Sequence, residues 1–455
     1  MPSRHRWATV AAIAVGAASL VGCNADAGTG LWLRDHEPVV LTGAQVGDLV
    51  GVAPGSIVAF RWNGDAALWD QVPVQVDQRH QEFLTKLRNG SGATGTKVLA
   101  YSDPTANAGA DPVPTFDADD EVAFMVDDTG ALAPAGAGNP AGVVAGSGVA
   151  VTVRDPLVGT SQWRGNGLGH VYLFQRSGSL DPSAGADYVD YDFAPSDPMG
   201  HAEDSTVSTD RYTTHFSARW TRDEITLGPG PDILDRHRNL FSVGQCVRSE
   251  DTFSTGDGGF ATNIDGPVRV IRSYLGANSG TYTQREHLFY RGVERVQTFL
   301  CVHQIPGIID FYDYSPAAAG MRYSSSATSG VTVDGTPDAV PSAAPTWESV
   351  AGAQGTLVTV SSLVTSISGV TMQGYYTDDS TPSAVQCTGD AFEYGASGTA
   401  ITSPLPNTDP SIAGPVATFT ATRWNVYGPA SESTSVPLQV DNLANPLTTT
   451  VAPYL

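Results

Sequence analysis

The amino-acid sequence predicts an all-β protein, with a small N-terminal β domain, a large antiparallel β-sandwich or supersandwich and a C-terminal β region. Glycine (49 residues) and proline (30 residues) punctuate the chain, together with abundant Ser, Thr and Val. Short alternating runs between such turn residues are typical of β-strands. After the first 23 residues, no long stretch repeats apolar residues with the period of a helix.

The first 23 residues predict export and a membrane anchor. A short basic segment, MPSRHR, precedes the apolar WATVAAIAVGAASL and then LVGC at residues 20–23. Such an order is typical of a secretory signal peptide, and the apolar part is short for a membrane span. LVGC resembles the lipobox of bacterial lipoproteins, which implies cleavage before Cys23, a lipid on Cys23 and an extracytoplasmic place in the bacterial cell envelope. The alternative is an ordinary signal peptide with an incidental cysteine.

Shifts in composition divide the rest of the chain. Strand-like runs such as SIVAFRW and EVAFMV precede a Gly/Ala/Pro-rich segment, and residues 201–300 then hold 11 of the 22 arginines. The last two regions could form a single large sandwich. The expected segments are a signal peptide (1–22), a lipidated cysteine and tether (23–36), an N-terminal β domain (37–150), a central Arg/His-rich β-sandwich (151–322) and a Ser/Thr-rich C-terminal β region (323–455).

The charge balance limits the partners. Lys and Arg number 24 against 47 Asp and Glu, so the formal net charge is −23. A charge this negative argues against non-specific binding to nucleic acid or to an anionic membrane surface. The expected membrane contact is therefore the lipid on Cys23, and no nucleic-acid partner is expected.

The segment 265–292, DGPVRVIRSYLGANSGTYTQREHLFYRG, predicts a β-hairpin. VRVIRSYL and TYTQREHLFYR are strand-like, and LGANSG between them supplies turn residues. Because side chains alternate along a strand, Arg285 and His287 should share a face. The run RVQTFLCVH follows. The register of this run against the hairpin cannot be read from the sequence, so Arg295 and His303 could lie on the same sheet face as Arg285 and His287.

A sheet face with Arg, His and Tyr side chains would suit the floor of a sugar groove. Arginine binds carboxylates in a bidentate way, and a Tyr or a neutral His can remove a proton beside a carboxylate that Arg has neutralised. This chemistry suits β-elimination on a uronic acid. The alternative is a solvated sheet face with ion pairs, which is common in antiparallel sheets. The candidate catalytic residues are His287, Arg285, Tyr212, His215 and Arg219.

A resemblance supports this interpretation. GPVRVIR, the Gly/Asn/Ser turn and REHLFY resemble bacterial β-supersandwich proteins of the galactose-mutarotase-like type, a fold shared by several polysaccharide lyases. VPVQVDQR and FDADDEVAFMVDDTG are similar to the small β domain that precedes such a sandwich. The resemblance covers about residues 40–322 and implies a secreted protein with a carbohydrate-related role. It implies no individual catalytic residue, because fold likeness does not establish activity.

An acidic segment at residues 102–130 is a candidate cation site. Carboxylates crowded on a loop suit Ca²⁺, although the run departs from the EF-hand pattern, with Val122 where that loop needs glycine. The alternative is an acidic turn before the strand EVAFMV. Ca²⁺ is the one candidate cofactor, and the candidate ligands are Asp117, Asp119, Asp120 and Glu121.

The remaining cysteines predict a disulfide between Cys246 and Cys301, with buried thiols as the alternative. The sequence holds no HExxH, CxxC or CxxCH motif, and SGATGTK and GANSG match neither a P-loop nor a nucleophile elbow. The function we expect is an envelope lipoprotein that binds or processes polysaccharide, with an acidic polymer favoured. The alternative is a non-catalytic adhesion or scaffold lipoprotein.

Overall fold

The computed structural model describes residues 34–158, 166–197, 202–218, 220–241, 249, 258–276, 282–380, 393–409 and 417–454. Strands make up 50% and helices 8%, and the strands form several antiparallel sheets. The predicted all-β fold class is therefore confirmed. Within the described ranges, no helix combines the length and the apolar character that crossing a membrane requires.

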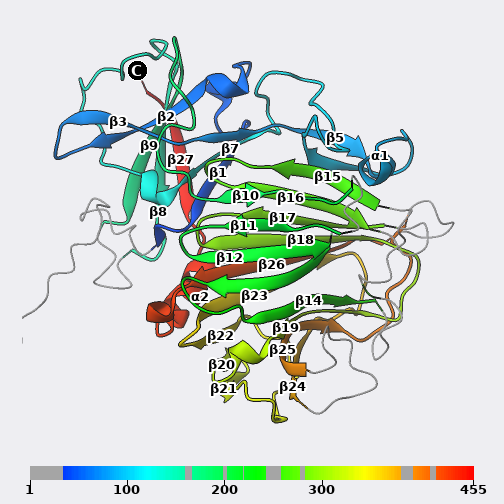
Figure 1. Cartoon of the computed structure of the whole chain (residues 1–455). Helices are drawn as coiled ribbons and strands as arrows, with labels where there is room; N and C mark the ends of the chain where they lie inside the picture. Colours follow the sequence, from blue (N-terminus) through cyan, green and yellow to red (C-terminus); the bar gives the residue numbers. More distant parts are fainter. Residues whose placement is uncertain are drawn as a thin grey trace, which may run out of the picture.

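One large antiparallel sheet organises the molecule, and its strands descend like rungs in Figure 1. In order across the sheet, the nine strands are β15 (Gly258–Ile264), β16 (Val270–Gly276), β17 (Tyr282–Phe289), β18 (Val293–Cys301), β26 (Phe419–Gly428), β23 (Gly355–Thr365), β22 (Glu348–Gly352), β20 (Arg322–Ser325) and β21 (Thr328–Thr332).

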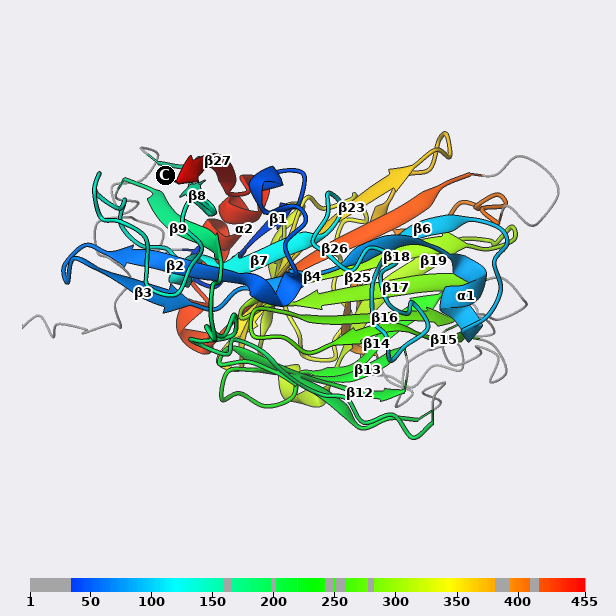
Figure 2. The same cartoon turned by 90° about the horizontal axis from the view of Figure 1, so that it is seen from above.

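Two four-stranded sheets cover one face of this nine-stranded sheet. They meet where β13 lies beside β14 and Ile233 N donates to Ile225 O (2.9 Å). Figure 2 shows β12 and β13 along one side of β16 to β18. One sheet contains β10 (Asp190–Asp192), β11 (Ser205–Ser208), β12 (Tyr212–Ala218) and β13 (Thr221–Leu227), and the other contains β14 (Leu234–Leu240), β19 (Ile308–Tyr314), β25 (Glu393–Ile401) and β24 (Gln373–Asp379).

An aromatic core joins the two layers into a sandwich. Tyr212 and Phe216 of β12 pack with Phe289 of β17, Tyr312 of β19 and Tyr427 of β26, and all five are buried. Large rings fill the space between the layers because each buries much apolar surface. The sandwich interior is therefore solid, and the opposite face of the nine-stranded sheet is the one that meets the N-terminal region.

The N-terminal region has its own valine-rich core, in which Val149, Val151 and Val153 of β8 alternate toward the interior. A five-stranded sheet contains, in order, β27 (Thr448–Tyr454), β8 (Gly148–Arg154), β9 (Leu168–Gln175), β2 (Ile57–Asn63) and β3 (Leu68–Val72). A three-stranded sheet contains β1 (Pro38–Thr42), β7 (Glu121–Met125) and β4 (Gln75–Asp77). A two-stranded sheet contains β5 (Arg79–Phe83) and β6 (Lys97–Tyr101). The helices are α1 (Leu84–Asn89) and α2 (Val436–Ala444), with short 3₁₀ helices η2 (Gly47–Leu49), η3 (Pro54–Ser56), η4 (Val126–Asp128), η6 (Pro316–Ala318) and η7 (Ala430–Glu432).

Strands distant in sequence share sheets. The last strand, β27 (red), pairs with β8 inside the N-terminal region (Figure 1). β23 and β26 join the sheet that begins with β15 to β18, and β25 pairs with β19. The regions predicted as 151–322 and 323–455 thus share both layers of the sandwich, while the domain boundaries themselves stay a prediction.

The predicted hairpin is present as β16 and β17, which pair antiparallel from Val270 opposite Phe289 to Gly276 opposite Thr283. Arg285 and His287 share one face of β17, as expected, but that face points into the sandwich instead of forming an open groove. The expectation that Arg295 joins them is wrong. Arg295 lies opposite Leu288, so it points to the other face of the sheet. His303 follows the end of β18 and extends neither face of that strand.

Cys301 is a free thiol, buried beside Leu275 and Ala261. Burial raises the pKa of the Cys301 thiol to about 12. The predicted bond to Cys246 is not formed, because Cys301 sits in an apolar cluster as a small hydrophobic residue. Cys246 itself lies outside the described residues, as does Cys23.

Candidate functional site

His287 and Arg285, two of the predicted catalytic residues, lie inside the sandwich and are 3% and 1% exposed. His287 Nδ1 is 2.7 Å from Glu294 Oε1, and the ring stacks on Phe289. Burial, which disfavours the charged imidazole, lowers the pKa of His287 to about 3. His287 is therefore neutral at pH 7, as a general base would have to be, but it is enclosed.

Glu294 is the centre of a buried polar network. It accepts hydrogen bonds from Arg222 Nη1 (3.0 Å) and Asn425 Nδ2 (2.8 Å), and from the Tyr427 hydroxyl. Burial opposes the ionisation of Glu294, but the Arg222 guanidinium outweighs it and holds the pKa of the carboxyl well below its usual range. A charged pair can remain this buried because hydrogen bonds satisfy both carboxylate oxygens and both terminal nitrogens of Arg222, although Arg222 Nε has no partner among the described residues.

Arg285 belongs to a second buried cluster. Its guanidinium donates to Asp310 Oδ2 (2.7 Å) and lies over the ring of Trp220, 4.8 Å from the centroid. Asp310 also pairs with His237 and Arg423 at 2.8 Å each. Burial opposes the charge on Asp310, but Arg423 and Arg285 together hold its pKa far below the usual range. Arg285 is thus committed to an internal carboxylate.

Tyr212 also faces the interior. Its ring stacks on Tyr427 with centroids 4.1 Å apart, and its hydroxyl donates to the backbone oxygen of Tyr290 (3.0 Å). Burial raises the pKa of Tyr212 well above its ordinary value. A tyrosine in this setting holds the two layers together and does not release its proton near neutral pH.

His215 lies on the other face of β12, where its ring nitrogens contact Asp223 (2.7 Å) and Asp204 (2.9 Å). Burial lowers the pKa of His215, but the hydrogen bonds to these two carboxylates outweigh it, and the net shift is upward. Arg219 lies outside the described residues. The four described members of the predicted set therefore do not share one cleft, because the second layer covers the face that was expected to be open. A polymer does not reach His287, Arg285 and Tyr212, which are buried, and His215 is partly exposed but lies apart from them on the other face of β12. We assign none of the four a ligand contact.

The predicted cation ligands divide into two groups. One carboxylate oxygen from each of Asp117, Asp119 and Asp120 lies within 4.8 Å of the others, so these three could hold a divalent cation. Glu121 points elsewhere, into ion pairs with Arg79 and Arg269 (2.6 and 2.8 Å). Sequence spacing alone did not separate Glu121 from the three aspartates. Glu121 is the first residue of β7, so the strand directs its side chain, whereas the aspartates belong to the preceding loop.

The loop that carries these aspartates is held close to the end of β1. Gly43 N donates to Asp120 O (2.8 Å), and a Cβ on Gly43 would lie 1.7 Å from Asp117 O. Asp120 Oδ1 accepts from Arg79 N (2.7 Å) and Oδ2 from Asp117 N (2.9 Å). Backbone donors thus organise the acidic loop, and calcium binding stays a prediction.

We expect the Asp119→Asn variant to be more stable than wild type at pH 7.5 without divalent ions, by no more than about 1 kcal/mol given partial solvent screening. The hydrogen bond with Asp117, burial and the Asp117 charge raise the pKa of Asp119 to about 6. An acid whose pKa is raised on folding stabilises the protein below pH 3.8 and loses that contribution as the pH rises through 6. Thermal melts with and without Ca²⁺ measure the effect. A cation site predicts that Ca²⁺ stabilises wild type and not the variant, whereas an acidic turn predicts no Ca²⁺ effect in either.

The outer face of the nine-stranded sheet contains a cavity of about 500 Å³. Its floor is formed by β17, β18, β26 and β23, where Leu288, Arg295, Trp424 and Val360 form one cross-strand row. β1 and α2 provide the walls, for example through Leu443. The volume is typical of small-molecule sites, which range over roughly 300–1,000 Å³.

Arg295 is a charged group on the floor of this cavity. Its Nη2 donates to Glu286 Oε1 (2.9 Å), and its side chain is 26% exposed. Its Nε is one of several buried polar atoms that have no hydrogen-bond partner among the described residues. Because that nitrogen is buried, a ligand in the cavity would contact the exposed part of the Arg295 side chain.

Two other arginines line the cavity and are held by protein partners. Arg269 donates to Asp77 and Glu121 (2.8 Å each). Arg34 donates to the carbonyl oxygens of Asn442 (3.0 Å) and Asn445 (2.9 Å), which belong to the C-terminal end of α2. A cation is favourable at the end of a helix where carbonyl groups lack partners. Arg34 thereby holds the helix that walls the cavity.

Trp424 lies beside Arg295 and is partly exposed to the cavity, while it also packs with Val440 and Leu443 of α2. The sequence interpretation missed Trp424. One signal was present, since the dipeptide Arg423–Trp424 contains the only basic residue after Arg322. This signal could not locate Trp424 beside Arg295, because the pairing of β26 with β18 joins residues that are far apart in the chain.

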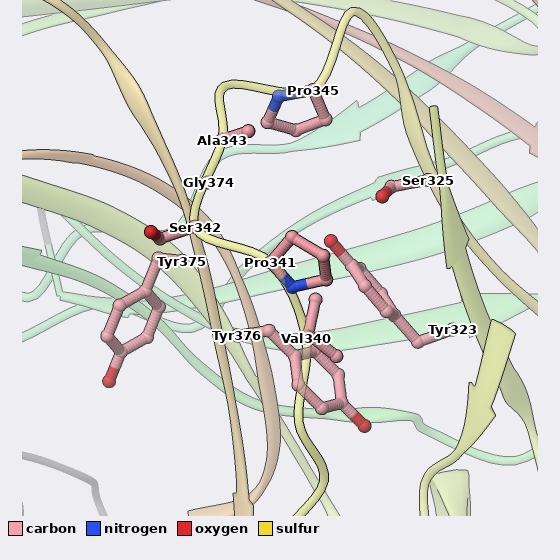
Figure 3. A pocket seen from close by; sticks show the side chains of 10 residues that line it. All are labelled: Tyr323, Ser325, Val340, Pro341, Ser342, Ala343, Pro345, Gly374, Tyr375 and Tyr376. Carbon is pink, nitrogen blue, oxygen red and sulfur yellow. The ribbon is translucent and has the colours of Figure 1, made fainter. Parts of the chain in front are cut away.

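A smaller cavity, of about 210 Å³, lies where β20 and β24 meet the segment 340–345 (Figure 3). The rings of Tyr323 and Tyr376 stack with centroids 4.4 Å apart, and Pro341 lies against them. The Tyr323 hydroxyl donates to Glu348 (3.3 Å). Among the described residues that line this cavity none is charged, and the polar side chains are the hydroxyl groups of Ser325, Ser342 and the tyrosines. Its volume is below the roughly 300 Å³ at which small-molecule sites begin.

Comparison with known proteins is limited to shape. No family model matches the chain, and no curated protein matches it in sequence. Among solved structures, it is similar to an α-mannosidase from Enterococcus faecalis V583 and to a glycosyl hydrolase family 38 protein from Enterococcus faecalis, each with a TM-score of 0.40 and 8% identity. These alignments cover 91% of this chain but only 43% and 45% of those chains, so the chain spans less than half of their length. A likeness this distant carries no functional argument.

Proposed function

We propose that this protein is a bacterial cell-envelope lipoprotein that binds an acidic saccharide in the cavity between the nine-stranded sheet, β1 and α2. The observation that carries the proposal is the pairing of Trp424 with Arg295, since both side chains line this cavity and both are partly exposed. The proposal is for binding, since the predicted catalytic set does not assemble in this cavity.

The chemistry of the cavity fits a sugar that carries a carboxylate. An indole offers a flat apolar surface to the C–H face of a sugar ring, and a guanidinium offers planar donors to a carboxylate. Gln45 and Thr449 on the walls add neutral groups that can bond hydroxyls. Apolar residues such as Val360 on the floor exclude water and strengthen these polar contacts.

The overall charge makes this binding selective. At a formal net charge of −23, the protein repels polyanions at long range. Arg34, Arg269 and Arg295 line the cavity together with Glu37 and Glu121, and the three arginines also pair with Asp155, Asp77 and Glu286 in that order. An acidic ligand would therefore bind through the exposed part of Arg295 rather than through a general positive charge of the cavity.

The proposed anchor lies close to the cavity in the sequence. Arg34, in the cavity wall, follows Cys23 by 11 residues. A chain of that length reaches at most roughly 40 Å when fully extended. A lipid on Cys23 would thus hold the cavity near the membrane surface, where envelope polysaccharides are accessible.

The test is direct binding to the soluble chain of residues 24–455. We expect a uronate-containing oligosaccharide to bind, and a neutral oligosaccharide of equal length to bind at least tenfold more weakly, because one charge-assisted hydrogen bond contributes about 1.5–3 kcal/mol. Arg295→Gln and Trp424→Ala should each weaken uronate binding by about tenfold or more for the same reason. Titration calorimetry measures the affinities, and ultraviolet absorbance for unsaturated uronate reports any lyase activity.

Arg322→Gln is the control, because Arg322 is exposed and lies on β20, outside the cavity. It should bind like wild type. Absence of binding across a broad uronate panel, or binding that ignores both cavity substitutions, would contradict the proposal and favour a scaffold or adhesion role. Absorbance that grows with time would instead show that the protein is a lyase.

A further inference from the structure

The outer face of the sheet continues beyond the cavity as a strip of partly exposed side chains. Along β18, Arg295 is followed on the same face by Gln297 and Phe299. On β26, Trp424, Thr422 and Thr420 lie directly opposite these three in turn. Two aromatic rings thus mark the ends of the strip, and amide and hydroxyl groups lie between them.

A second cavity, of about 170 Å³, lies over the far end of this strip. Gln297, Phe299 and Thr420 line it from the sheet, and Leu99 of β6 lines it from the N-terminal region. The volume is small for an independent ligand site, for which roughly 300 Å³ is a lower limit.

The two cavities lie on neighbouring rows of the same sheet face. The row that contains Arg295 and Trp424 is followed at once by the row that contains Glu286, Gln297 and Thr422. The ion pair of Arg295 with Glu286 (2.9 Å) joins a residue of the first cavity to one of the second. From Arg295 to Phe299 the strip extends roughly 13 Å, at about 3.3 Å per residue.

We propose that the strip is a single groove that holds several consecutive sugar residues of an acidic polysaccharide. This inference rests on the proposed function and deepens it from a sugar to a chain. A carboxylate-bearing residue binds at Arg295 and Trp424, the next residues bond to Gln297 and Thr422, and a further ring packs on Phe299. Hydroxyl-rich ligands suit this order, because alternating amide and hydroxyl groups offer both donors and acceptors.

The experiment compares a uronate monosaccharide with a hexasaccharide on wild type, Phe299→Ala and Gln297→Ala chains. We expect wild type to bind the hexasaccharide about tenfold or more tightly than the monosaccharide. Both substitutions should remove most of that gain and leave monosaccharide affinity unchanged, because the monosaccharide binds at Arg295 and Trp424. Gln297→Ala is included because Phe299 also packs on a small apolar cluster, whereas Gln297 only faces the groove.

Leu132→Ala is the matched control, because Leu132 is an exposed apolar residue away from the strip. Equal affinity for the two lengths, or equal losses for both ligands in the variants, would overturn the groove while the proposed function stands. Failure of both ligands to bind would instead overturn the proposed function. An oligoglutamate of the hexasaccharide's charge should not bind, and equal binding would show that the strip recognises charge rather than sugar.

Discussion

Replacing Arg222 with methionine should destabilise the protein by about 3–5 kcal/mol, the cost of leaving one member of a buried ion pair alone. Arg222 is fully buried and pairs with Glu294 across the two layers of the sandwich. Its Nη1 also donates to the hydroxyls of Tyr312 and Tyr427 (3.3 Å each). Removing the guanidinium leaves the Glu294 carboxylate charged in the core or forces it to take up a proton.

The double variant Arg222→Met with Glu294→Leu separates the charge effect from the loss of packing. It should recover much of the lost stability, because replacing both members of a buried pair by apolar groups is often neutral. Denaturant unfolding at pH 7 measures all three chains, with Arg322→Met, at an exposed position of β20, as the control. A single variant as stable as wild type would show that the pair contributes nothing to the sandwich.

Replacing Glu348 with glutamine should stabilise the protein at high pH by about 3 kcal/mol, which is the free energy of a pKa shift of this size. Burial, which disfavours the charged form, raises the pKa of Glu348 to about 7, although Arg423 partly opposes the shift. The folded protein therefore stabilises the neutral acid. Its contribution to stability is full below pH 4.5 and is lost as the pH rises through 7.

Glutamine cannot ionise, so the stability difference between Glu348→Gln and wild type should grow between pH 5 and pH 8.5. Unfolding titrations across that range measure the difference, which removes the contributions of other titrating groups. Glu224→Gln, on β13, is the control with a less buried carboxyl. A difference that is flat with pH would show that Glu348 keeps its ordinary pKa in the folded state.

Local alternation predicted which side chains share a face, but not which face is buried. Arg285 and His287 do share one face of β17, as the period of two requires. Polar groups on a strand face suggested that the face is exposed to solvent, yet both side chains are inside the sandwich. Their carboxylate partners, Asp310 and Glu294, come from β19 and β18, and these contacts offset the free-energy cost of burying polar groups.

Strand register decided the place of Arg295. The tight connection between β17 and β18 puts Arg295 opposite Leu288 rather than on the face of His287. A shift of one residue would have moved it into the sandwich. The alternation along β18 was therefore readable from the sequence, but the face of the sheet on which Arg295 lies was not.

The sequence by itself determined the strand-rich fold class, the hairpin of β16 and β17, and the alternation of side chains along each strand, because these depend on neighbouring residues. Only the tertiary structure decided that β26 lies beside β18, that β27 returns to β8, and that Arg34 holds the end of α2. The cavity of Arg295 and Trp424 is built from these contacts. They join segments far apart in the chain, and their pairing follows from burial of whole sheet faces rather than from any local pattern.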